Sequence, residues 1–499
     1  MQYDAIILGA GAAGLASALK LSGSGKKVIL LEKQPRPGGF ATCFNRKGYT
    51  FESAVHCVDA LSKDGRIRNF LEEAGVAKEV DFIELNNFVR VSYPEHDFTV
   101  DSNCNNFISF LKRTFPQEES NIDKLFSDFD SFYKTLAVFN APGAPGQMKK
   151  IMAAFASADM IKASSLTTEQ FIQQHIQDPK LKAIIPSIWG FSGLPPSRLS
   201  AFYFLILFNG YHYNPTCYIK GGFRRLFEAM ANKIQENGSE VRFNTAVKKI
   251  ITGVDNQAKA VLTENGQELK AGTIISNANC FDTLVNFPDN DAVRESYRKK
   301  LFSLEKSISA FQVYLGLKVP AESLGMKQFM WFLCNNYNHD ENFQYSLSGD
   351  YDNSSISLVD HAQIDRALAP EGKGTLLIFT LDAYSNWENL GRQEYQNKKL
   401  QAADKLIRRV EKYLPGLSKC IEVMEIATPK TIARFGPSPE GAIYGFAQTV
   451  NQAGIKRLAQ VTKIKGLFLA GAWTRPGGGV HACFISGIQA AELALRFLK

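Results

Sequence analysis

A glycine-rich turn between two apolar runs constrains this chain more than any other stretch. Residues 3–8 predict a buried strand, and Gly9, Gly11 and Gly14 follow in a Gly-x-Gly-x-x-Gly spacing. An alanine-rich helix is expected over 13–22, and a second apolar run at 28–31 ends at the acid Glu32. Strand, turn, helix, strand and acid in this order are typical of a dinucleotide-binding fold.

Each glycine of the turn meets a separate requirement of such a site. Gly9 permits the tight turn, Gly11 lets the backbone approach a pyrophosphate, and Gly14 lets helix and strand pack closely. The free N–H groups at the helix start face the phosphates, and Glu32 can accept hydrogen bonds from a ribose. A glycine-rich turn without a ligand is the alternative, and the two flanking strands argue against it.

The residues after the second strand help to choose between dinucleotides. Arg36, Gly38 and Gly39 form an Arg-x-Gly-Gly segment. In the glutathione-reductase-like flavoproteins, such a segment runs along the diphosphate and flavin of FAD. The chain therefore resembles an FAD protein with its dinucleotide fold at the N-terminus.

A second glycine-rich signal lies near the C-terminus. A buried strand is expected at 467–471, three glycines occupy 477–479, and a helix is predicted over 481–498. Consecutive glycines let the backbone approach a flat ring, and a helix N-terminus stabilises the negative charge of a reduced flavin.

The middle of the chain is rich in aromatic residues. A helix predicted at 197–209 is apolar on all sides, so it is either buried or faces an apolar ligand such as an elongated lipophilic substrate. Apolar residues at 148–161 alternate with lysines, which fits an interfacial basic helix and a core-facing helix equally well. Residues 82–100 predict a hairpin, and 428–444 predict a loop-rich stretch.

Composition bounds the remaining possibilities. The 499 residues include eight cysteines without a Cys-x-x-Cys pair, which we interpret as reduced thiols of a cytoplasmic protein with no metal site. The net charge of +8 is spread along the sequence, so no nucleic-acid partner is expected. We expect no signal peptide and no membrane-spanning segment, and a peripheral membrane contact stays open.

The motifs together resemble those of one family. The N-terminal glycines, Glu32, Gly221-Gly222, Asn277-Ala278 and the run from Gly471 to Gly479 resemble the phytoene desaturase superfamily. That superfamily includes carotene desaturases, carotenoid cis–trans isomerases and retinol saturase. Residues 428–431 and 441–445 are similar to the isomerase and saturase branch. Two departures are the Glu52-Ser53-Ala54 segment, where the family has acid-x-Gly, and Ala472, where many flavoproteins have an acid.

The resemblance implies an α/β fold. A glutathione-reductase-like Rossmann FAD-binding domain is interleaved with an α+β substrate domain. We assign residues 1–60, 215–285 and 420–499 to the FAD-binding domain. Residues 61–214 and 286–419 form the lipophilic-substrate domain, whose helices include candidates for facing a membrane.

The candidate site residues follow from the motifs and the resemblance. The predicted FAD-binding residues are Gly9, Gly11, Ala12, Ala13, Gly14, Glu32, Lys33, Arg36, Gly38, Gly39, Val247, Asn277, Gly471, Ala472, Gly479 and Val480. The candidate catalytic residues are His481, His56, Arg434 and Tyr444. His481 begins a helix, so its imidazole is expected to stay neutral.

The resemblance implies an FAD-dependent oxidoreductase that saturates or desaturates a carotenoid or retinoid by hydride transfer at flavin N5. The Ala54-Val55-His56 segment favours reduction. A redox-neutral cis–trans isomerase with reduced FAD is the alternative, and an amine oxidase or a prenyl carrier without flavin chemistry fits less well. Because the sequence lacks a second dinucleotide motif, the electron donor or acceptor is expected to be external.

Overall fold

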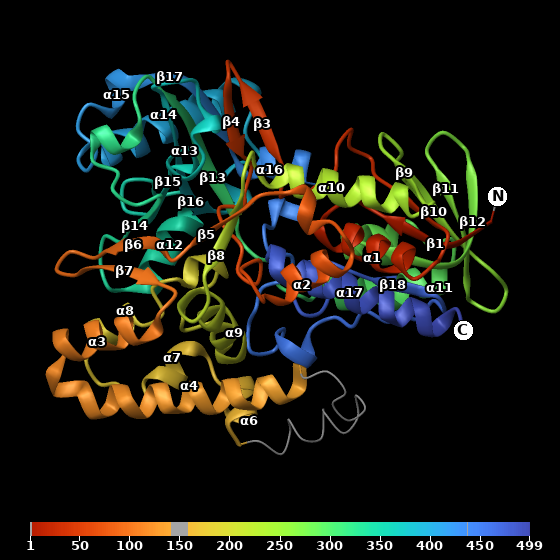
Figure 1. The fold of residues 1–499 in the computed structure, drawn as a ribbon, viewed down its shortest axis with the longest axis horizontal. Coiled ribbons are helices and arrows are strands. Elements are labelled where there is room, and N and C mark those ends of the chain that lie inside the picture. Colours follow the sequence, from red (N-terminus) through yellow and green to blue (C-terminus); the bar gives the residue numbers. More distant parts are fainter. Residues whose placement is uncertain (1, 141–157, 437) are drawn as a thin grey trace.

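The computed structural model describes residues 2–140, 158–436 and 438–499. Within these ranges, two seven-stranded sheets occupy opposite ends of the longest axis (Figure 1). Two short two-stranded pairs, β3 (Cys43–Arg46) with β4 (Tyr49–Glu52) and β5 (Phe82–Leu85) with β8 (Thr216–Ile219), lie outside them. Both termini lie at the end formed by the first sheet.

The first sheet has the strand order β10-β11-β12-β1-β2-β9, with β18 also paired to β12. Its strands are β1 (Gln2–Leu8), β2 (Val28–Leu31), β9 (Glu240–Arg242), β10 (Val247–Thr252), β11 (Ala258–Thr263), β12 (Glu268–Ser276) and β18 (Leu467–Leu469). The strands β18, β12, β1, β2 and β9 run parallel, and β2 is buried along its whole length, as expected for a strand covered on both faces.

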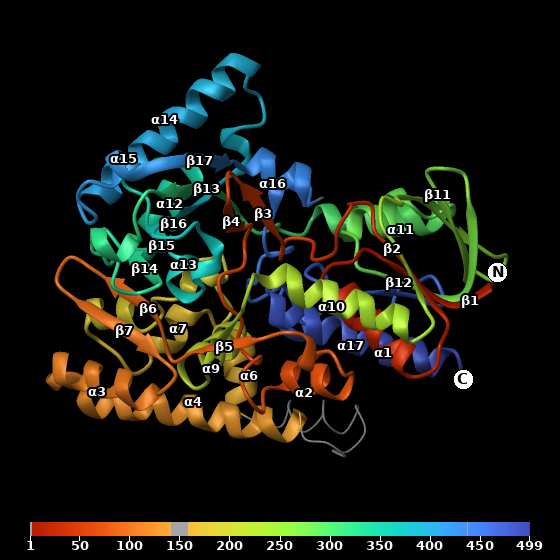
Figure 2. The ribbon, with the colours of Figure 1, turned by 45° about the horizontal axis from the view of Figure 1, so that its top comes forward.

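Three helices lie close together over this sheet: α1 (Ala12–Gly23), α10 (Phe223–Glu236) and α17 (Val480–Phe497) (Figure 2). The first and last helices touch where Gly487 meets the backbone of Ala13, so closely that a methyl group on Gly487 would collide with it. The hydroxyl of Ser17 donates to the Gly487 carbonyl at 2.8 Å. The two glycine-rich motifs at the chain ends are therefore brought together by helix packing.

The second sheet has the order β17-β13-β16-β15-β14-β6-β7 and is antiparallel except for the pair β14–β6. Its strands are β6 (Asn87–Ser92), β7 (Asp97–Asp101), β13 (Ser309–Leu317), β14 (Met330–Leu333), β15 (Ile356–Val359), β16 (Gly374–Asp382) and β17 (Ile421–Ala427). The sequence placed 420–427 with the FAD-binding part, but β17 pairs with β13 and lies in the second sheet. The rest of the domain division stays a prediction.

Helices surround both sheets. The remaining helices are α2 (Arg66–Glu73), α3 (Cys104–Thr114), α4 (Glu119–Asn140), α6 (Ala158–Ser165), α7 (Thr168–Ile172), α8 (Pro179–Ile184), α9 (Ala201–His212), α11 (Asp291–Phe302), α12 (His339–Ser348), α13 (His361–Ile364), α14 (Arg392–Glu411), α15 (Leu417–Cys420) and α16 (Pro429–Phe435). Most of the predicted basic helix at 148–161 lies outside the described residues. Within them, no helix is long and apolar enough to cross a membrane.

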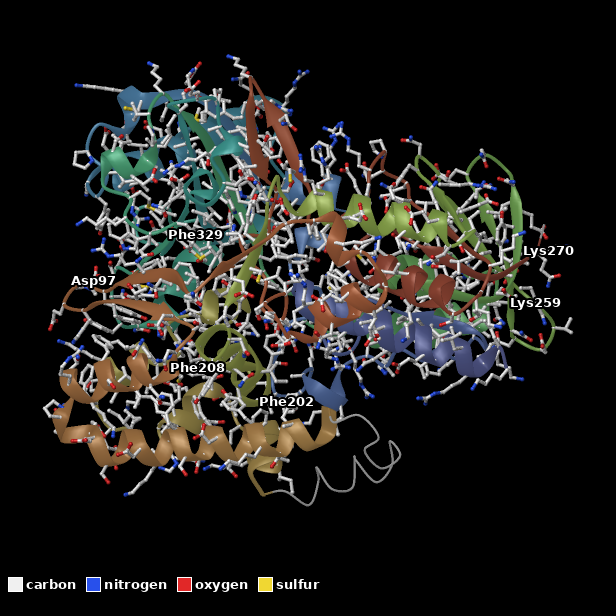
Figure 3. All side chains as sticks on the ribbon, in the orientation of Figure 1. Asp97, Phe202, Phe208, Lys259, Lys270 and Phe329 are labelled. Atoms are coloured by element: carbon white, nitrogen blue, oxygen red, sulfur yellow. The ribbon has the colours of Figure 1, made fainter. Side chains whose placement is uncertain are left out.

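Helix α9 lies between α4 and the second sheet, and Figure 3 labels Phe202 and Phe208 on it. Phe208 is fully buried and packs on Phe129 of α4, with ring centroids 5.2 Å apart. The half-buried Phe202 and Leu207 line a cavity instead. The helix is apolar on all sides, as predicted, because one side packs in the hydrophobic core and the other side lines the cavity.

Two local predictions were right only in part. Residues 428–444 are not a loop throughout, because Thr428 and Thr431 form a capping box and Pro429 opens α16. The predicted hairpin at 82–100 is limited to β6 and β7, since β5 leaves it to pair with β8. The alternation of apolar and polar residues does not indicate with which distant strand β5 pairs.

Glu52 links two elements of the fold, a role that its motif did not predict. Its Oε1 accepts hydrogen bonds from the Phe223 N–H and the Tyr218 hydroxyl, both at 2.9 Å, so it ties the end of β4 to the start of α10. Gly222 adopts φ +97° at that start, and a methyl group there would press on the Cys43 sulfur. Burial raises the pKa of Glu52 to about 7, against the lowering effect of its hydrogen bonds and of Arg224.

Candidate functional site

The first turn forms a cradle between β1 and α1. Gly9 has φ +92°, and a side chain on Gly14 would collide with the Gly9 carbonyl oxygen. Gly11 is the N-cap of α1 and accepts from the Leu15 N–H at 3.0 Å. Only glycine at position 14 lets the helix start this close to the strand, and this leaves the helix N-terminus open to a phosphate.

The segment after β2 folds back onto this turn. The Gly38 N–H donates to the Ala10 carbonyl at 2.8 Å, and a side chain on Gly39 would touch the Gly11 backbone. Glu32 is buried at the end of β2 and accepts from the N–H groups of Ala10 and Gln34 at 2.6 and 2.8 Å. A carboxylate has about four lone-pair positions, so two remain for ribose hydroxyls.

The C-terminal loop completes the cradle. The Asn277 side chain lies between Gly11 and Gly471, close enough that a methyl group on either glycine would collide with it. Gly479 has φ +95° and is the N-cap of α17. A methyl group on Gly479 would meet no atom within 4 Å, so this glycine faces open space. These residues would hold a dinucleotide between the two glycine-rich turns.

One cavity connects these parts. It has a volume of about 2120 Å³, and its lining includes these predicted site residues: Gly9, Gly11, Ala12, Glu32, Lys33, Gly38, Gly39, His56, Val247, Asn277, Tyr444, Ala472, Gly479, Val480 and His481. Pockets for drug-sized ligands measure about 300–1,000 Å³, so this cavity has room for a dinucleotide and a second large ligand.

The other predicted residues lie elsewhere among the described residues. Ala13, Gly14 and Gly471 are packed behind the cavity wall and shape it through the backbone. Arg36 is exposed, and so is Arg434, whose guanidinium lies over the Phe435 ring with 5.4 Å to the centroid. The structure therefore does not bring Arg434 to the cavity, and the roles of all these residues stay predictions.

His481 is paired with an acid that sequence reasoning missed. Its Nδ1 lies 2.7 Å from Oδ2 of Asp59, and both residues line the cavity. Burial opposes the charged imidazole, but the charge and hydrogen bond of the Asp59 carboxylate outweigh it, so the pKa of His481 is raised. The expectation of a neutral His481 took no account of Asp59, because the sequence does not place this acid at that helix N-terminus.

His56 is in a different environment. Burial lowers its pKa to about 4, its Nδ1 has no hydrogen-bond partner within the described chain, and the His361 ring lies 5.6 Å away between centroids. The Phe379 ring contacts it edge-on at 6.1 Å. Because the His56 imidazole is neutral at neutral pH, we expect it to line the cavity and not to donate a proton.

Two tyrosines lie beside the glycine loop. The Tyr203 hydroxyl donates to the Gly478 carbonyl at 3.1 Å, and burial raises its pKa to about 12. The Tyr444 hydroxyl donates to the Gly190 carbonyl at 3.4 Å, and burial raises its pKa further. Both phenols stay protonated at neutral pH.

A buried arginine supports the same loop from behind. Arg457 is 2% exposed, and its guanidinium donates to the carbonyls of Thr474, Phe446 and Ala472 at 2.9, 3.0 and 2.5 Å. Burial lowers its pKa to about 10, so it stays charged at neutral pH. No motif marked Arg457, because its partners are backbone atoms.

The far part of the cavity is lined mainly by aromatic and aliphatic side chains, with some polar ones among them. Its floor is one face of the second sheet, where Phe332, Ser357, Phe379 and Gln312 stand in one row across β14, β15, β16 and β13. Aromatic residues of α9 and of the turn at Trp189–Phe191 cover it. This shape suits a long, largely apolar ligand.

Comparison with known proteins bears on the family and the fold. The sequence profile of the family described as flavin containing amine oxidoreductase matches residues 12–495. A solved oxidoreductase from Methanosarcina mazei superposes with a TM-score of 0.66 at 19% identity, covering 99% of this chain and all of that one, which supports the fold alone.

Three curated relatives match nearly the whole chain. Prolycopene isomerase 1 of an Oncidium hybrid cultivar is 28% identical over 98% of this chain and 83% of its own length. All-trans-retinol 13,14-reductase of Danio rerio is 25% identical over 94% and 82%. Phytoene desaturase (neurosporene-forming) of Rhodobacter capsulatus is 24% identical over 98% and 93%. The resemblance deduced from the motifs is confirmed.

Proposed function

The chain belongs to the flavin-containing amine oxidoreductase family, and from that premise we propose that it acts on a carbon–carbon double bond of a lipophilic polyene. The cofactor of this family is FAD, and the chain is an FAD-dependent oxidoreductase. The observation that carries the proposal is the single cavity that joins the glycine cradle to the aromatic face of the second sheet.

FAD, when bound, supplies a hydride donor or acceptor at its N5 atom. The glycines of both motifs let the backbone hold the dinucleotide, and the aromatic walls exclude water from the polyene. His481 holds a proton, because its Nδ1–H is fixed on Asp59 and Nε2 is left to exchange with a substrate. Saturation consumes one hydride and one proton, so a single proton donor suffices.

The reaction has two candidate outcomes. Saturation or desaturation, the outcome favoured by the sequence, changes the substrate by two hydrogens and requires an external electron donor or acceptor. Cis–trans isomerisation changes neither mass nor redox state, and it is supported by the 28% identity to prolycopene isomerase, against 25% to the retinol reductase.

One experiment tests the function and separates the outcomes. FAD-loaded protein is incubated without oxygen with all-trans-retinol, lycopene or prolycopene, with and without dithionite, and products are read by mass and absorbance. A change of two hydrogens supports a saturase or desaturase, and unchanged mass with a shifted spectrum supports an isomerase. If no polyene reacts while a primary amine yields peroxide in air, the proposal is wrong and an amine oxidase replaces it.

A further inference from the structure

The end of the cavity at α12 and β15 carries several polar side chains beside apolar residues such as Phe332, Leu333 and Phe379. Ser355 and Ser357 are half-buried and line the cavity, whereas Ile356 and Leu358, which alternate with them, are buried in the core on the opposite face. Aliphatic residues would suit a hydrocarbon ligand at these two positions.

These hydroxyl groups are not used by the protein. Neither Ser355 nor Ser357 makes a side-chain hydrogen bond to any residue that the structure describes, and their exposed surface lies inside the cavity. Nearby on α12, Asn342 is 2% exposed and its Oδ1 has no partner within the described chain, although its Nδ2 donates to Asn336. A polar group that a ligand covers without pairing it costs about 1–3 kcal/mol, so a ligand that accepts from or donates to the two serine hydroxyls gains affinity over one that does not.

The distribution of charged side chains along the cavity indicates which charge a ligand group can carry at the α12 and β15 end. The lysines and arginines that line the cavity are Lys33, Lys63, Arg66, Arg475 and Arg496, and they belong to the dinucleotide side, around β2, α2, α17 and the C-terminal loop. The described lining at α12 and β15 contains none. A carboxylate would be buried there without a counter-ion, whereas a neutral hydroxyl or carbonyl oxygen would be satisfied by serine.

We propose that Ser355 and Ser357 form a subsite for a neutral oxygen function, a hydroxyl or carbonyl group, at one end of the polyene. The inference rests on the proposed function and adds the substrate class: an oxygenated polyene rather than a hydrocarbon. Phe379 lies between His56 and this subsite, because its ring contacts His56 and Ser357 is its neighbour across β15 and β16. The apolar body of the ligand would lie on that ring.

Matched ligand pairs test the subsite independently of turnover. The affinity of FAD-loaded protein for all-trans-retinol and for its deoxy analogue, in which hydrogen replaces the hydroxyl group, is measured by quenching of tryptophan emission, since Trp189 and Trp473 line the cavity. Zeaxanthin and β-carotene provide a longer pair. We expect each hydroxylated ligand to bind about 5-fold or more tightly, as one added hydrogen bond predicts.

Substitution then locates the effect. The S355A/S357A variant should lose the preference and bind the hydrocarbon at least as well as the wild type does. Ser354→Ala is the matched control, because Ser354 is buried on the same segment and does not line the cavity.

Equal affinity of the two ligands for the wild type, or a preference that survives in S355A/S357A, would overturn the subsite and leave the proposed function intact. If none of the four polyenes quenches emission, the polyene function itself fails and the subsite fails with it.

Discussion

The imidazole of His481 and the carboxylate of Asp59 meet at 2.7 Å inside the cavity, although 422 residues separate them in the chain. The contact joins the start of the last helix to the loop before α2. It places a proton-holding group beside Gly479, where the flavin ring is expected. The pair is therefore the most direct point at which to test proton transfer.

Replacing Asp59 by Asn should shift the pH dependence of turnover. Burial alone lowers the pKa of a histidine, so without the acid the raised pKa of His481 falls. If protonated His481 donates the proton, the alkaline limb of the kcat–pH profile moves to lower pH. The pKa itself is read by NMR of the labelled imidazole.

Asp64→Asn is the control for this shift, because Asp64 lines the same cavity but is exposed. It should leave the profile unchanged. A fallen imidazole pKa with an unmoved kcat profile would show that His481 does not donate the proton.

Gly14→Ala should remove FAD from the purified protein. The new methyl group collides with the Gly9 carbonyl oxygen and pushes α1 away from β1, so the turn no longer fits a pyrophosphate. We expect a fall of about tenfold or more in the ratio of flavin to protein absorbance. Gly23→Ala, in the same helix with open space around it, should keep the wild-type ratio, and equal loss in both variants would mean that general helix damage is the cause.

Arg457→Met should destabilise the protein even without cofactor. Methionine matches the length of the side chain but leaves the carbonyls of Phe446, Ala472 and Thr474 without their donor. We expect a loss of at least about 3 kcal/mol in the free energy of unfolding, measured by urea denaturation. Arg496→Met, at an exposed position, should stay within about 0.5 kcal/mol of the wild type, and a similarly small change at Arg457 would contradict its supporting role.

Glu52→Gln should remove a pH dependence of stability. Because the pKa of Glu52 is raised to about 7 in the fold, the folded state binds its proton more tightly than the unfolded chain does. Its stabilising contribution is therefore complete below the unfolded pKa and is lost as pH rises through about 7. The total amounts to roughly 3 kcal/mol.

Urea unfolding at pH 5 and pH 8 measures this effect. The wild type should lose stability between the two values, and the glutamine variant, which keeps an oxygen for Phe223 and Tyr218, should lose much less. Glu425→Gln, at a position whose side chain is 40% exposed, should follow the wild type. The same loss in Glu52→Gln as in the wild type would assign the pH dependence to other groups.

Local motifs were informative about the backbone of the glycine-rich turns. The glycines at 9, 11, 14, 38, 39 and 479 meet constraints set by their immediate neighbours, so sequence spacing alone was informative. It failed where a side chain depends on a distant partner. Nothing in the sequence distinguishes Asp59 from the other acidic residues, and only the fold brings it to His481. Arg457 has no motif either, because its hydrogen-bond partners are backbone carbonyls.

The same limit explains the errors in the substrate half. Residue Arg434 was chosen from a motif, but the capping box at Thr428 makes a helix that points it to solvent. Ser355 and Ser357 looked like ordinary strand residues, because polarity at alternate positions usually marks a solvent-facing side. Only the structure shows that this side faces the cavity.

The parallel pairing of β1 with β12, and of β12 with β18, also has a consequence during synthesis. The strand β1 leaves the ribosome long before its partner β12, residues 268–276, has been synthesised. The strand β18, residues 467–469, can pair with β12 only near the end of synthesis. In the same way, β6 cannot pair with β14 until residues 330–333 have been synthesised. Such non-local pairing slows folding and leaves strand edges open. We therefore expect the nascent chain to depend on chaperones, and truncation before β18 to leave a species that aggregates.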